Sequence, residues 1–351
     1  MSPVTGLDDL ESLATARLAP GAAEYIRRGS DENRTRSANL AAWARWALVP
    51  HVLRDVGDVD TATTVLGAAV RAPVLVAPTA MQQLASPDAE EATARAAHRA
   101  RSLMIVSMAA SRSVEAVAAA ASDAPRWAQM YLLRDRGRTR ALAERTRDAG
   151  YRAIVVSVDG AAVPVDRRSA APAPPGLPFP NLASPGETHA DLLAALADFD
   201  PTVTADDLAL FRDWTGLPVV VKGVLRADDA RACVAAGAAG IAVSNHGGRL
   251  VDGCVATGDV LPEIADAVGD DAEVYVDGGI RSGVDVLRAL ALGARAVLVG
   301  RPVVWGLAID GEDGVAAVLD LLMRDLTRAM RFCGAPDLGA ITRDLLAPMS
   351  P

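Results

Sequence analysis

The chain has 351 residues, of which 51% are hydrophobic, and its 44 acidic and 35 basic residues give a net charge of −9. This length and apolar content suffice for one large domain with a substantial core. The acidic balance argues against a nucleic-acid or anionic-membrane surface, and no uninterrupted apolar stretch reaches the roughly 18 residues that a membrane-spanning helix needs. We therefore expect a cytoplasmic protein with small-molecule partners, no nucleic-acid partner and no membrane partner. The three cysteines lack CxxC spacing, so they predict neither a disulfide framework nor a metal site.

Residues 1–70 are predicted to form an N-terminal helical cap. Apolar residues recur with helical spacing in residues 7–18, 22–30 and 39–48. These segments come before the first run that reads as a buried strand, so the cap precedes a second region of residues 71–351.

The second region contains eight short apolar runs separated by alanine-rich helical segments. Near-continuous runs of Val, Ile and Leu are typical of strands buried on both faces. The helical segment 282–293 carries a capping box at Ser282 and Asp285 and a C-cap at Gly293. The alternation predicts an α/β fold, a (β/α)8 TIM barrel. An open doubly wound sheet also alternates, but no GxGxxG follows the first run, which favours the barrel. The runs are residues 73–78, 103–107, 127–131, 153–159, 218–223, 240–245, 274–279 and 296–301.

A long segment of about residues 160–205 interrupts the repeat after the fourth strand. It is dense in proline, with the cluster APAPPGLPFP at residues 171–180. An insertion of this length in a regular barrel is either an active-site lid or a disordered excursion. We expect a lid.

Polar residues stand at the end of almost every predicted strand. Because the carboxyl ends of barrel strands meet on one face, these side chains should line one cavity. The segment SNHGGRLVDG at 244–253 places His246 three residues from Arg249, and this pair can take a proton and hold an anion at one spot. The remaining polar residues of this rim are Ser107, Gln129, Tyr131, Ser157, Asp159, Lys222, Asn245, Asp277, Arg281 and Arg301.

The last two predicted strands are each followed by a glycine-containing turn and an arginine. The sequences are VDGGIRSG at 276–283 and VGRP at 299–302. Glycines let backbone N–H groups approach a phosphate, and the helix that follows favours its charge. The glycines alone are also compatible with tight turns, but the two arginines favour a phosphate. Lys222 on a buried strand is costly unless it faces an anion or an electron-rich ring, such as the N1–O2 edge of a flavin.

Taken in order, these motifs resemble the FMN-dependent 2-hydroxy acid oxidase and dehydrogenase family, which includes glycolate oxidase, lactate oxidase and mandelate dehydrogenase. The resemblance runs almost from end to end of the chain. The segments that carry it are EYIRRGSDE (24–32), APTAMQ (77–82), AQMYLLRDR (128–136), SVDG (157–160), LPVVVKGV (217–224), AAGIAVSNHGGRLVDG (238–253) and VYVDGGIRSGVDVLRALALGARAVLVGRPV (274–303).

The resemblance implies FMN as the cofactor. One segment would run beside the flavin ring, polar side chains would bond its edges, and Lys222 would face its N1–O2 edge. The last two loops would hold the ribityl phosphate. The implied cofactor-binding residues are Pro78, Thr79, Ala80, Ser107, Gln129, Ser157, Lys222, Ser244, Asp277, Gly279, Arg281, Gly300 and Arg301.

The resemblance also implies the catalytic roles. His246 is similar to the catalytic base, Asp159 to the carboxylate that stabilises its imidazolium, and Arg249 to the arginine that binds the substrate carboxylate. Tyr25 would add a hydrogen bond to that carboxylate. Tyr131 would contact the hydroxyl or developing keto oxygen.

Two departures from the family pattern bear on the substrate. The segment GAAVPVDRRSA at 160–170 replaces the usual approach to a second carboxylate-binding arginine. Arg168 is our choice for that role and Arg167 is the alternative. Ala109 stands where glycolate oxidase has a bulky tryptophan, which predicts a roomier pocket for a larger or aromatic side chain.

These features predict flavin-dependent oxidation of an (S)-2-hydroxy acid to the 2-oxo acid, with oxygen as the favoured acceptor and hydrogen peroxide as the product. Three alternatives remain at this stage: a dehydrogenase with another acceptor, an FMN barrel with isomerase chemistry, and a flavin-binding protein without turnover. The family resemblance further implies a homo-oligomer, often a tetramer.

Overall fold

The computed structural model describes residues 7–160, 177–183 and 198–349. Eight parallel strands close into a barrel in the order β10-β11-β4-β5-β6-β7-β8-β9. The predicted (β/α)8 barrel is therefore confirmed, and each apolar run overlaps one strand. The strands are β4 (Val74–Val76), β5 (Met104–Ser107), β6 (Arg126–Met130), β7 (Ile154–Ser157), β8 (Val219–Val224), β9 (Gly240–Val243), β10 (Glu273–Val276) and β11 (Ala296–Val299).

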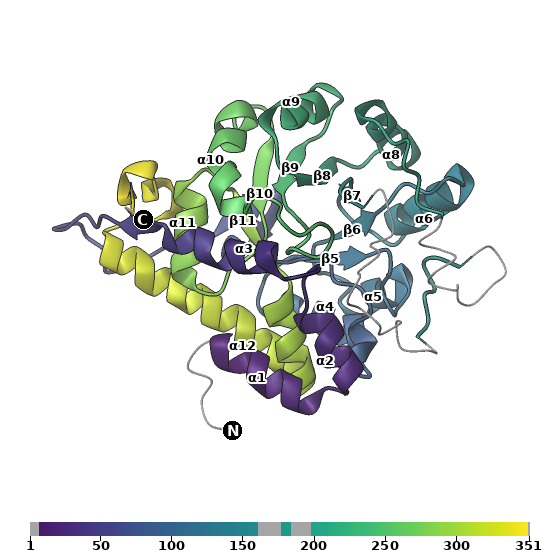
Figure 1. Cartoon of the computed structure of the whole chain (residues 1–351), viewed down its shortest axis with the longest axis horizontal. Coiled ribbons are helices and arrows are strands. Elements are labelled where there is room, and N and C mark those ends of the chain that lie inside the picture. The colour runs from purple at the N-terminus through teal and green to yellow at the C-terminus, as the bar shows by residue number, and fades with distance from the viewer. Residues whose placement is uncertain (1–6, 161–176, 184–197, 350–351) are drawn as a thin grey trace.

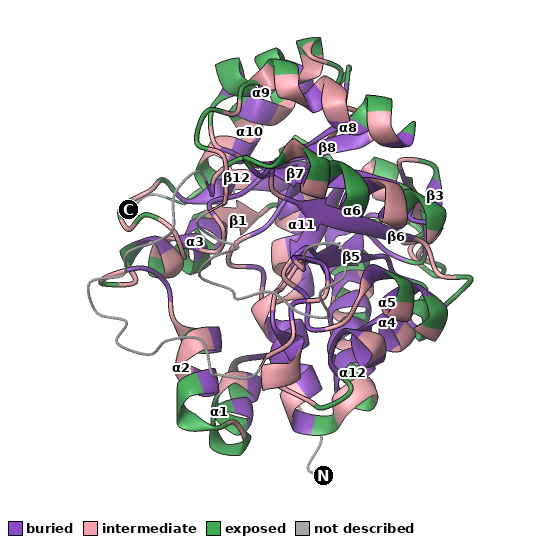
Figure 2. Cartoon of the chain, turned by 90° about the vertical axis from the view of Figure 1, so that its right-hand side faces the viewer, coloured by how far each residue is buried: buried purple, intermediate pink, exposed green. Residues whose placement is uncertain are grey.

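Helices surround the barrel, and the strands lie buried beneath them (Figure 2). Outward-pointing strand residues, such as Val76 and Val156, join the large core cluster formed with the helices. The helices after successive strands are α4 (Ala89–Arg99), α5 (Val114–Ala120), α6 (Arg136–Asp148), α8 (Leu208–Thr215), α9 (Ala227–Ala235), α10 (Thr257–Val268), α11 (Gly283–Ala291) and α12 (Arg301–Cys333).

Alternate strand residues form a second core cluster inside the barrel. Leu75, Ile105, Val155 and Tyr275 belong to it, and all are at most 1% exposed. A two-stranded hairpin, β2 (Thr63–Val65) and β3 (Ala68–Val70), contributes further side chains to this interior cluster. Since side chains alternate along a strand, the next inward position toward the carboxyl end of each barrel strand points into the mouth of the barrel.

The N-terminal region forms α1 (Leu7–Arg17), α2 (Pro20–Arg27) and α3 (Arg34–Ala44). Figure 1 shows α1 and α2 beside α12, while α3 lies against α10 and α11. The predicted helical segments are thus present, except that α2 ends at Arg27 rather than at residue 30 and that residues 46–48 are not helical. There the chain forms β1 (Trp46–Leu48), which pairs antiparallel with β12 (Leu346–Pro348). A partner strand some 300 residues away leaves no trace in local periodicity, so the prediction of a helix through residue 48 was wrong.

The predicted capping box of α11 is half formed. The Ser282 hydroxyl accepts a hydrogen bond from the Asp285 N–H at 3.1 Å. The Asp285 carboxylate instead accepts from the N–H of Arg281 at 3.0 Å. The helix start therefore also fixes the backbone of a residue predicted to hold phosphate.

Only part of the predicted lid lies within the described residues. Asn181 joins its segment 177–183 to the start of α5, since its side-chain oxygen accepts from the Val114 N–H at 2.9 Å and its nitrogen donates to the Arg112 carbonyl at 2.9 Å. Phe199 forms a single β-bridge with Leu133. The lid function itself stays a prediction. In the described part of the chain, no helix is both long and apolar enough to cross a membrane.

Candidate active site

A row of hydrogen-bonded polar side chains lines the mouth between β5 and β7. The Ser107 hydroxyl donates to the Gln129 side-chain oxygen at 3.2 Å, and the Gln129 amide nitrogen donates to the Ser157 hydroxyl at 3.1 Å. All three residues are buried, and each occupies the inward position that follows an interior apolar residue. The row presents donors and acceptors at one edge of the mouth.

Lys222 continues this row on β8, where it is the register partner of Ser157 on β7. Its ammonium lies 3.0 Å from a carboxylate oxygen of Asp277 and donates to the Ser244 hydroxyl at 2.8 Å. Burial alone would lower the pKa of Lys222, but the negative charges of Asp277 and Asp159 outweigh it and raise this pKa. The other Asp277 side-chain oxygen, Oδ1, is buried and has no hydrogen-bond partner among the residues that the structure describes. A buried polar atom of this kind marks a place where a ligand donor can bind.

His246 and Asp159 form a hydrogen-bonded pair at the same rim. The His246 Nδ1 lies 3.2 and 3.1 Å from the two carboxylate oxygens. Burial would raise the pKa of Asp159, but the charge and hydrogen bond of His246, with the charge of Lys222, hold it below its ordinary value. Because Nδ1 faces the carboxylate, Nε2 is the ring nitrogen left for a substrate proton.

The backbone around this pair has an unusual conformation. His246 has φ +58°, and Gly247 and Gly248 follow at +62° and +74°. On the neighbouring strand, Gly223 has φ +111° at an irregularity in the β8–β9 register, and a Cβ there would lie 2.6 Å from the Asp159 carboxyl carbon. Gly223 thus leaves the space that Asp159 occupies.

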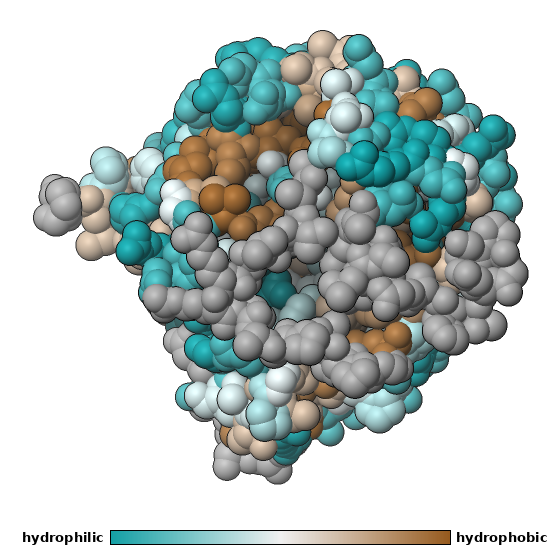
Figure 3. Space-filling view, turned by 45° about the vertical axis from the view of Figure 1, so that its right-hand side comes forward, coloured by the Kyte–Doolittle hydropathy of each residue, from teal (hydrophilic) through white to brown (hydrophobic). Residues whose placement is uncertain are grey.

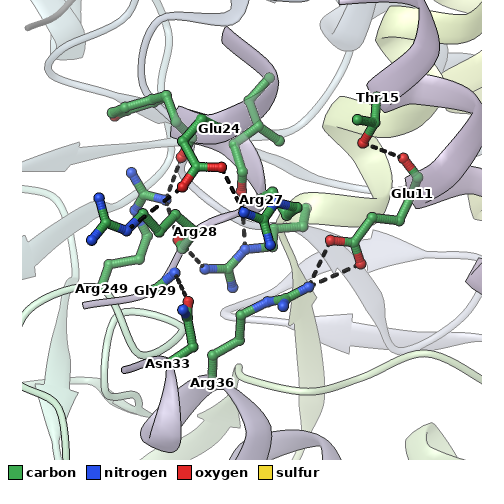
Figure 4. Close-up of polar contacts among 12 residues, drawn as sticks. Glu11, Thr15, Glu24, Arg27, Arg28, Gly29, Asn33, Arg36 and Arg249 are labelled. Carbon is green, nitrogen blue, oxygen red and sulfur yellow. Dashed lines mark hydrogen bonds and ion pairs between the residues drawn. The ribbon is translucent and has the colours of Figure 1, made fainter. Parts of the chain in front are cut away.

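Arg249 is held by the carboxyl end of α2. Its guanidinium donates to the carbonyls of Tyr25 at 2.8 Å and Arg28 at 3.0 Å, and it lies 4.6 Å from the centre of the Tyr25 ring. Figure 4 shows Arg249 reaching the residues at the end of α2, with Glu24 close by. Carbonyl groups at the end of α2 that lack intrahelical partners accept these hydrogen bonds. The N-terminal region therefore orients Arg249, a residue that belongs to the barrel.

Arg301 lies near other cations. Its guanidinium donates to the carbonyls of Ile26, Gly247 and Arg28 at 3.1, 2.9 and 2.9 Å. Burial, together with the positive charges of Arg249, Arg281 and Arg36, lowers the pKa of Arg301 well below its ordinary value. Cations gathered in this way favour an anion among them.

The glycines of the predicted phosphate loops differ in what they require. Gly279 has φ +83°, and a Cβ there would lie 2.1 Å from the carbonyl oxygen of Asn39 in α3. Its first role is therefore close packing of α3. A Cβ on Gly300 would make only ordinary contacts, the nearest being Thr79 at 3.6 Å.

Tyr131 lies next to the His246–Asp159 pair. Burial and the negative charge of Asp159 raise its pKa, while a hydrogen bond with Ser157 opposes this shift. The hydroxyl is therefore neutral and able to donate. Phe199 stacks on the Tyr131 ring at 4.3 Å between centroids. A cavity of about 300 Å³ borders Tyr131 and Phe199 and extends toward α8 and α9.

The structure brings most of the predicted residues to one rim. Hydrogen bonds and ion pairs connect two neighbouring groups, one of Ser107, Gln129 and Ser157 and one of Lys222, Ser244, Asp277, His246 and Asp159. Pro78, Thr79 and Ala80 follow β4 and are half-buried. The second carboxylate anchor, whether Arg168 or Arg167, lies outside the described residues.

Sequence reasoning missed three contributions to the site. One is Gly223, visible only as the glycine of VVVKGV. The second is Asn39, which forms a reciprocal amide pair with the predicted rim residue Asn245 through two hydrogen bonds of 2.8 Å and so attaches α3 to the His246 loop. The third is Asp252, whose carboxylate accepts from the Glu32 and Thr35 N–H groups at 3.0 and 2.9 Å. Asn245 and Asp252 both lie in the motif SNHGGRLVDG, which was their signal.

A family model described as FMN-dependent dehydrogenase matches residues 14–348. The chain belongs to this family. It is 43% identical over 353 residues to 2-hydroxyacid oxidase 1 of Homo sapiens, covering 97% of this chain and 95% of the human protein. It is 42% identical over 360 residues to L-lactate oxidase of Nostoc sp., covering 98% of each. A solved mandelate oxidase variant with (S)-mandelic acid shares 41% identity over 97% of each chain, with a TM-score of 0.87.

The family resemblance predicted from the motifs is thereby confirmed, and the chain is an oxidoreductase whose cofactor is FMN. The described residues fit this cofactor in three respects. The unpartnered Asp277 oxygen can accept from a ribityl hydroxyl, Lys222 offers a buried ammonium, and the cations around Arg301 suit a phosphate.

Proposed function

We propose that the protein oxidises an (S)-2-hydroxy acid to the 2-oxo acid, with His246 as the base and oxygen as the final acceptor. The observation that carries the proposal is the hydrogen-bonded pair of His246 and Asp159 at 3.1 Å, on the same rim as Lys222 and Arg249. A base, a carboxylate partner and an arginine suit an α-hydroxy carboxylate better than a diphosphate, which argues against isomerase chemistry.

The reaction removes two electrons and two protons from the C–OH group of the substrate. FMN supplies the two-electron acceptor when it is bound. The Nε2 of His246 accepts a substrate proton, and the Asp159 carboxylate stabilises the resulting imidazolium. The second role of the Asp159 carboxylate is to orient the His246 ring through the hydrogen bond at Nδ1.

Arg249 and Tyr131 bind the two polar ends of the substrate in this proposal. The Arg249 guanidinium holds the carboxylate, with Tyr25 beside it and Arg168 as the predicted second anchor. The neutral Tyr131 hydroxyl donates to the substrate oxygen, which gains electron density as the carbonyl forms. These contacts keep the α-carbon in one place while the proton leaves.

We further propose that the substrate has a bulky or aromatic side chain. Ala109 is small and half-buried at the loop after β5. The solved relative with (S)-mandelic acid is an oxidase of an aromatic 2-hydroxy acid by its name. The exposed residues Val158, Val251 and Val255 lie in the loops that follow β7 and β9. Figure 3 shows hydrophobic residues gathered in patches on one face of the molecule.

The test is anaerobic titration of the purified yellow protein with glycolate, (S)-lactate, (S)-mandelate and longer 2-hydroxy acids. We expect loss of the visible flavin absorbance, with (S)-mandelate and other bulky acids more effective than glycolate. The (R)-enantiomers serve as matched controls and should leave the absorbance unchanged. If none of the (S)-acids bleaches the flavin, the proposed reaction is wrong.

Readmission of oxygen then separates an oxidase from a dehydrogenase. An oxidase regains its absorbance within its turnover time and releases one peroxide per substrate. A protein that bleaches with hydroxy acid but regains colour only with an artificial acceptor is a dehydrogenase, and the oxygen assignment then fails. The homo-oligomeric state and the cytoplasmic location stay predictions.

A further inference from the structure

Glu90 is a buried carboxyl group that connects two active-site loops. It lies in the first turn of α4 and is 0% exposed. Its Oε1 accepts hydrogen bonds from the Gln82 N–H at 3.1 Å and the Ser111 N–H at 2.9 Å. Gln82 belongs to the loop after β4 and Ser111 to the loop after β5, so one oxygen atom bridges the two.

Hydrogen bonds continue from this bridge to the flavin-proximal segment. The Gln82 amide nitrogen donates to the Thr79 hydroxyl at 2.9 Å, and the Thr93 hydroxyl donates to the Gln82 side-chain oxygen at 2.6 Å. The Gln82 side chain is therefore fixed from both ends. Through it, α4 holds the segment Pro78–Ala80 that the family resemblance places beside the flavin ring.

The two loops are also joined directly at Ala109. The Met81 N–H donates to the Ala109 carbonyl at 3.2 Å, and the Gln83 N–H donates to the Ser111 hydroxyl at 3.2 Å. Met81 has φ +58°, a conformation that a non-glycine residue holds only when its surroundings impose it. The contacts around Glu90 supply that constraint.

Core stability alone does not explain a carboxyl group at this position. Burial raises the pKa of Glu90, opposed by its backbone hydrogen bonds, and its Oε2 is buried without a partner in the described part of the chain. An apolar side chain would avoid this cost but would leave two loop N–H groups unsatisfied. The Glu90 carboxyl group thus satisfies the N–H groups of the two loops rather than stabilising the core.

We propose that Glu90 is a positioning residue that sets the separation of the β4 and β5 loops and so places Thr79 against the flavin and Ala109 against the substrate side chain. The bridging oxygen, rather than a negative charge, performs this role. The proposal rests on the proposed function only for the part played by Ala109, since the placement of Thr79 concerns FMN alone.

The test compares Glu90→Gln with Glu90→Ala. Glutamine keeps an acceptor oxygen for both N–H groups and carries no charge, whereas alanine removes the bridge. We expect Glu90→Ala to weaken FMN binding by roughly 10- to 100-fold, as measured by flavin fluorescence, and to shift the visible flavin spectrum. Glu90→Gln should stay within about threefold of the wild type in both measurements.

Ser102→Ala is the matched control. Ser102 is equally buried, and its hydroxyl donates to the Val74 carbonyl at 2.7 Å, next to the start of β4 and away from the loops. This variant should lower the melting temperature without altering FMN affinity or the flavin spectrum. It separates loss of stability from loss of loop position.

Thr93→Val gives an independent variant if Glu90→Ala does not fold, because valine keeps the shape of threonine and removes only the donor to Gln82. It should weaken FMN binding in the same direction by a smaller factor. Wild-type FMN affinity and spectrum in a folded Glu90→Ala or Thr93→Val protein would overturn the proposal, as would equal losses in Glu90→Gln and Glu90→Ala. Absence of hydroxy acid turnover in the wild type would contradict the proposed function alone, because FMN affinity does not depend on turnover.

Discussion

Replacement of Asp159 by asparagine removes the negative charge beside His246 and keeps the shape of the side chain. Two unit charges 3.1 Å apart at an effective dielectric constant of about 20 attract each other by about 5 kcal/mol. The His246 side chain is 27% exposed, and asparagine retains a dipole, so we discount this to about 2–3 kcal/mol, as for other hydrogen bonds to charged groups. If the imidazolium forms in the transition state, Asp159→Asn slows flavin reduction by roughly 30- to 150-fold.

The assay is anaerobic stopped-flow reduction of the bound flavin by saturating (S)-2-hydroxy acid. FMN content should not change, which is checked by the absorbance of the purified variant. A natural control exists elsewhere in the chain, since His51 lies 3.0 Å from Asp344 in an exposed ion pair of the same kind. Asp344→Asn should leave the rate unchanged. A reduction rate within twofold of the wild type in Asp159→Asn would refute the role of Asp159 in stabilising the imidazolium.

Further expectations concern the base, its surroundings and the stability of the chain. His246→Ala should retain FMN and reduce the rate of flavin reduction by about 10²- to 10⁴-fold, measured in the same assay, and an unchanged rate would remove His246 from the mechanism. Gly223→Ala should displace Asp159, because the new Cβ would lie 2.6 Å from its carboxyl carbon at φ +111°, and the rate should fall by about tenfold or more without loss of FMN. Hydrogen bonds from Thr202, with an ion pair, lower the pKa of Asp200 to about 2, so its contribution to stability is present above its ordinary pKa and is lost as the pH falls from 4 toward 2. Asp200→Asn should therefore lower the melting temperature at pH 7, and the difference from the wild type should shrink over that acid range; a difference independent of pH would contradict the assignment.

The barrel and much of its mouth could be predicted because both follow from one short-range pattern. Val155 points into the barrel and Ser157 continues the same inward row, just as Tyr275 leads to Asp277. Side chains alternate every second residue along a strand, so apolar inward residues give way to polar ones where the strand leaves the core. The local sequence is therefore sufficient to predict this change from apolar to polar inward residues.

The sequence therefore determined the fold class, the FMN family and the identity of most rim residues, whereas the tertiary structure alone decided how those residues are held. Arg249 is aimed by carbonyls at the end of α2, more than 200 residues away, and β1 exists only because β12 lies beside it. The Glu90 bridge and the space that Gly223 leaves for Asp159 likewise involve segments that are separate in the sequence. Periodicity records which side of a strand or helix is buried, but the choice of a distant partner depends on the packing of the whole chain.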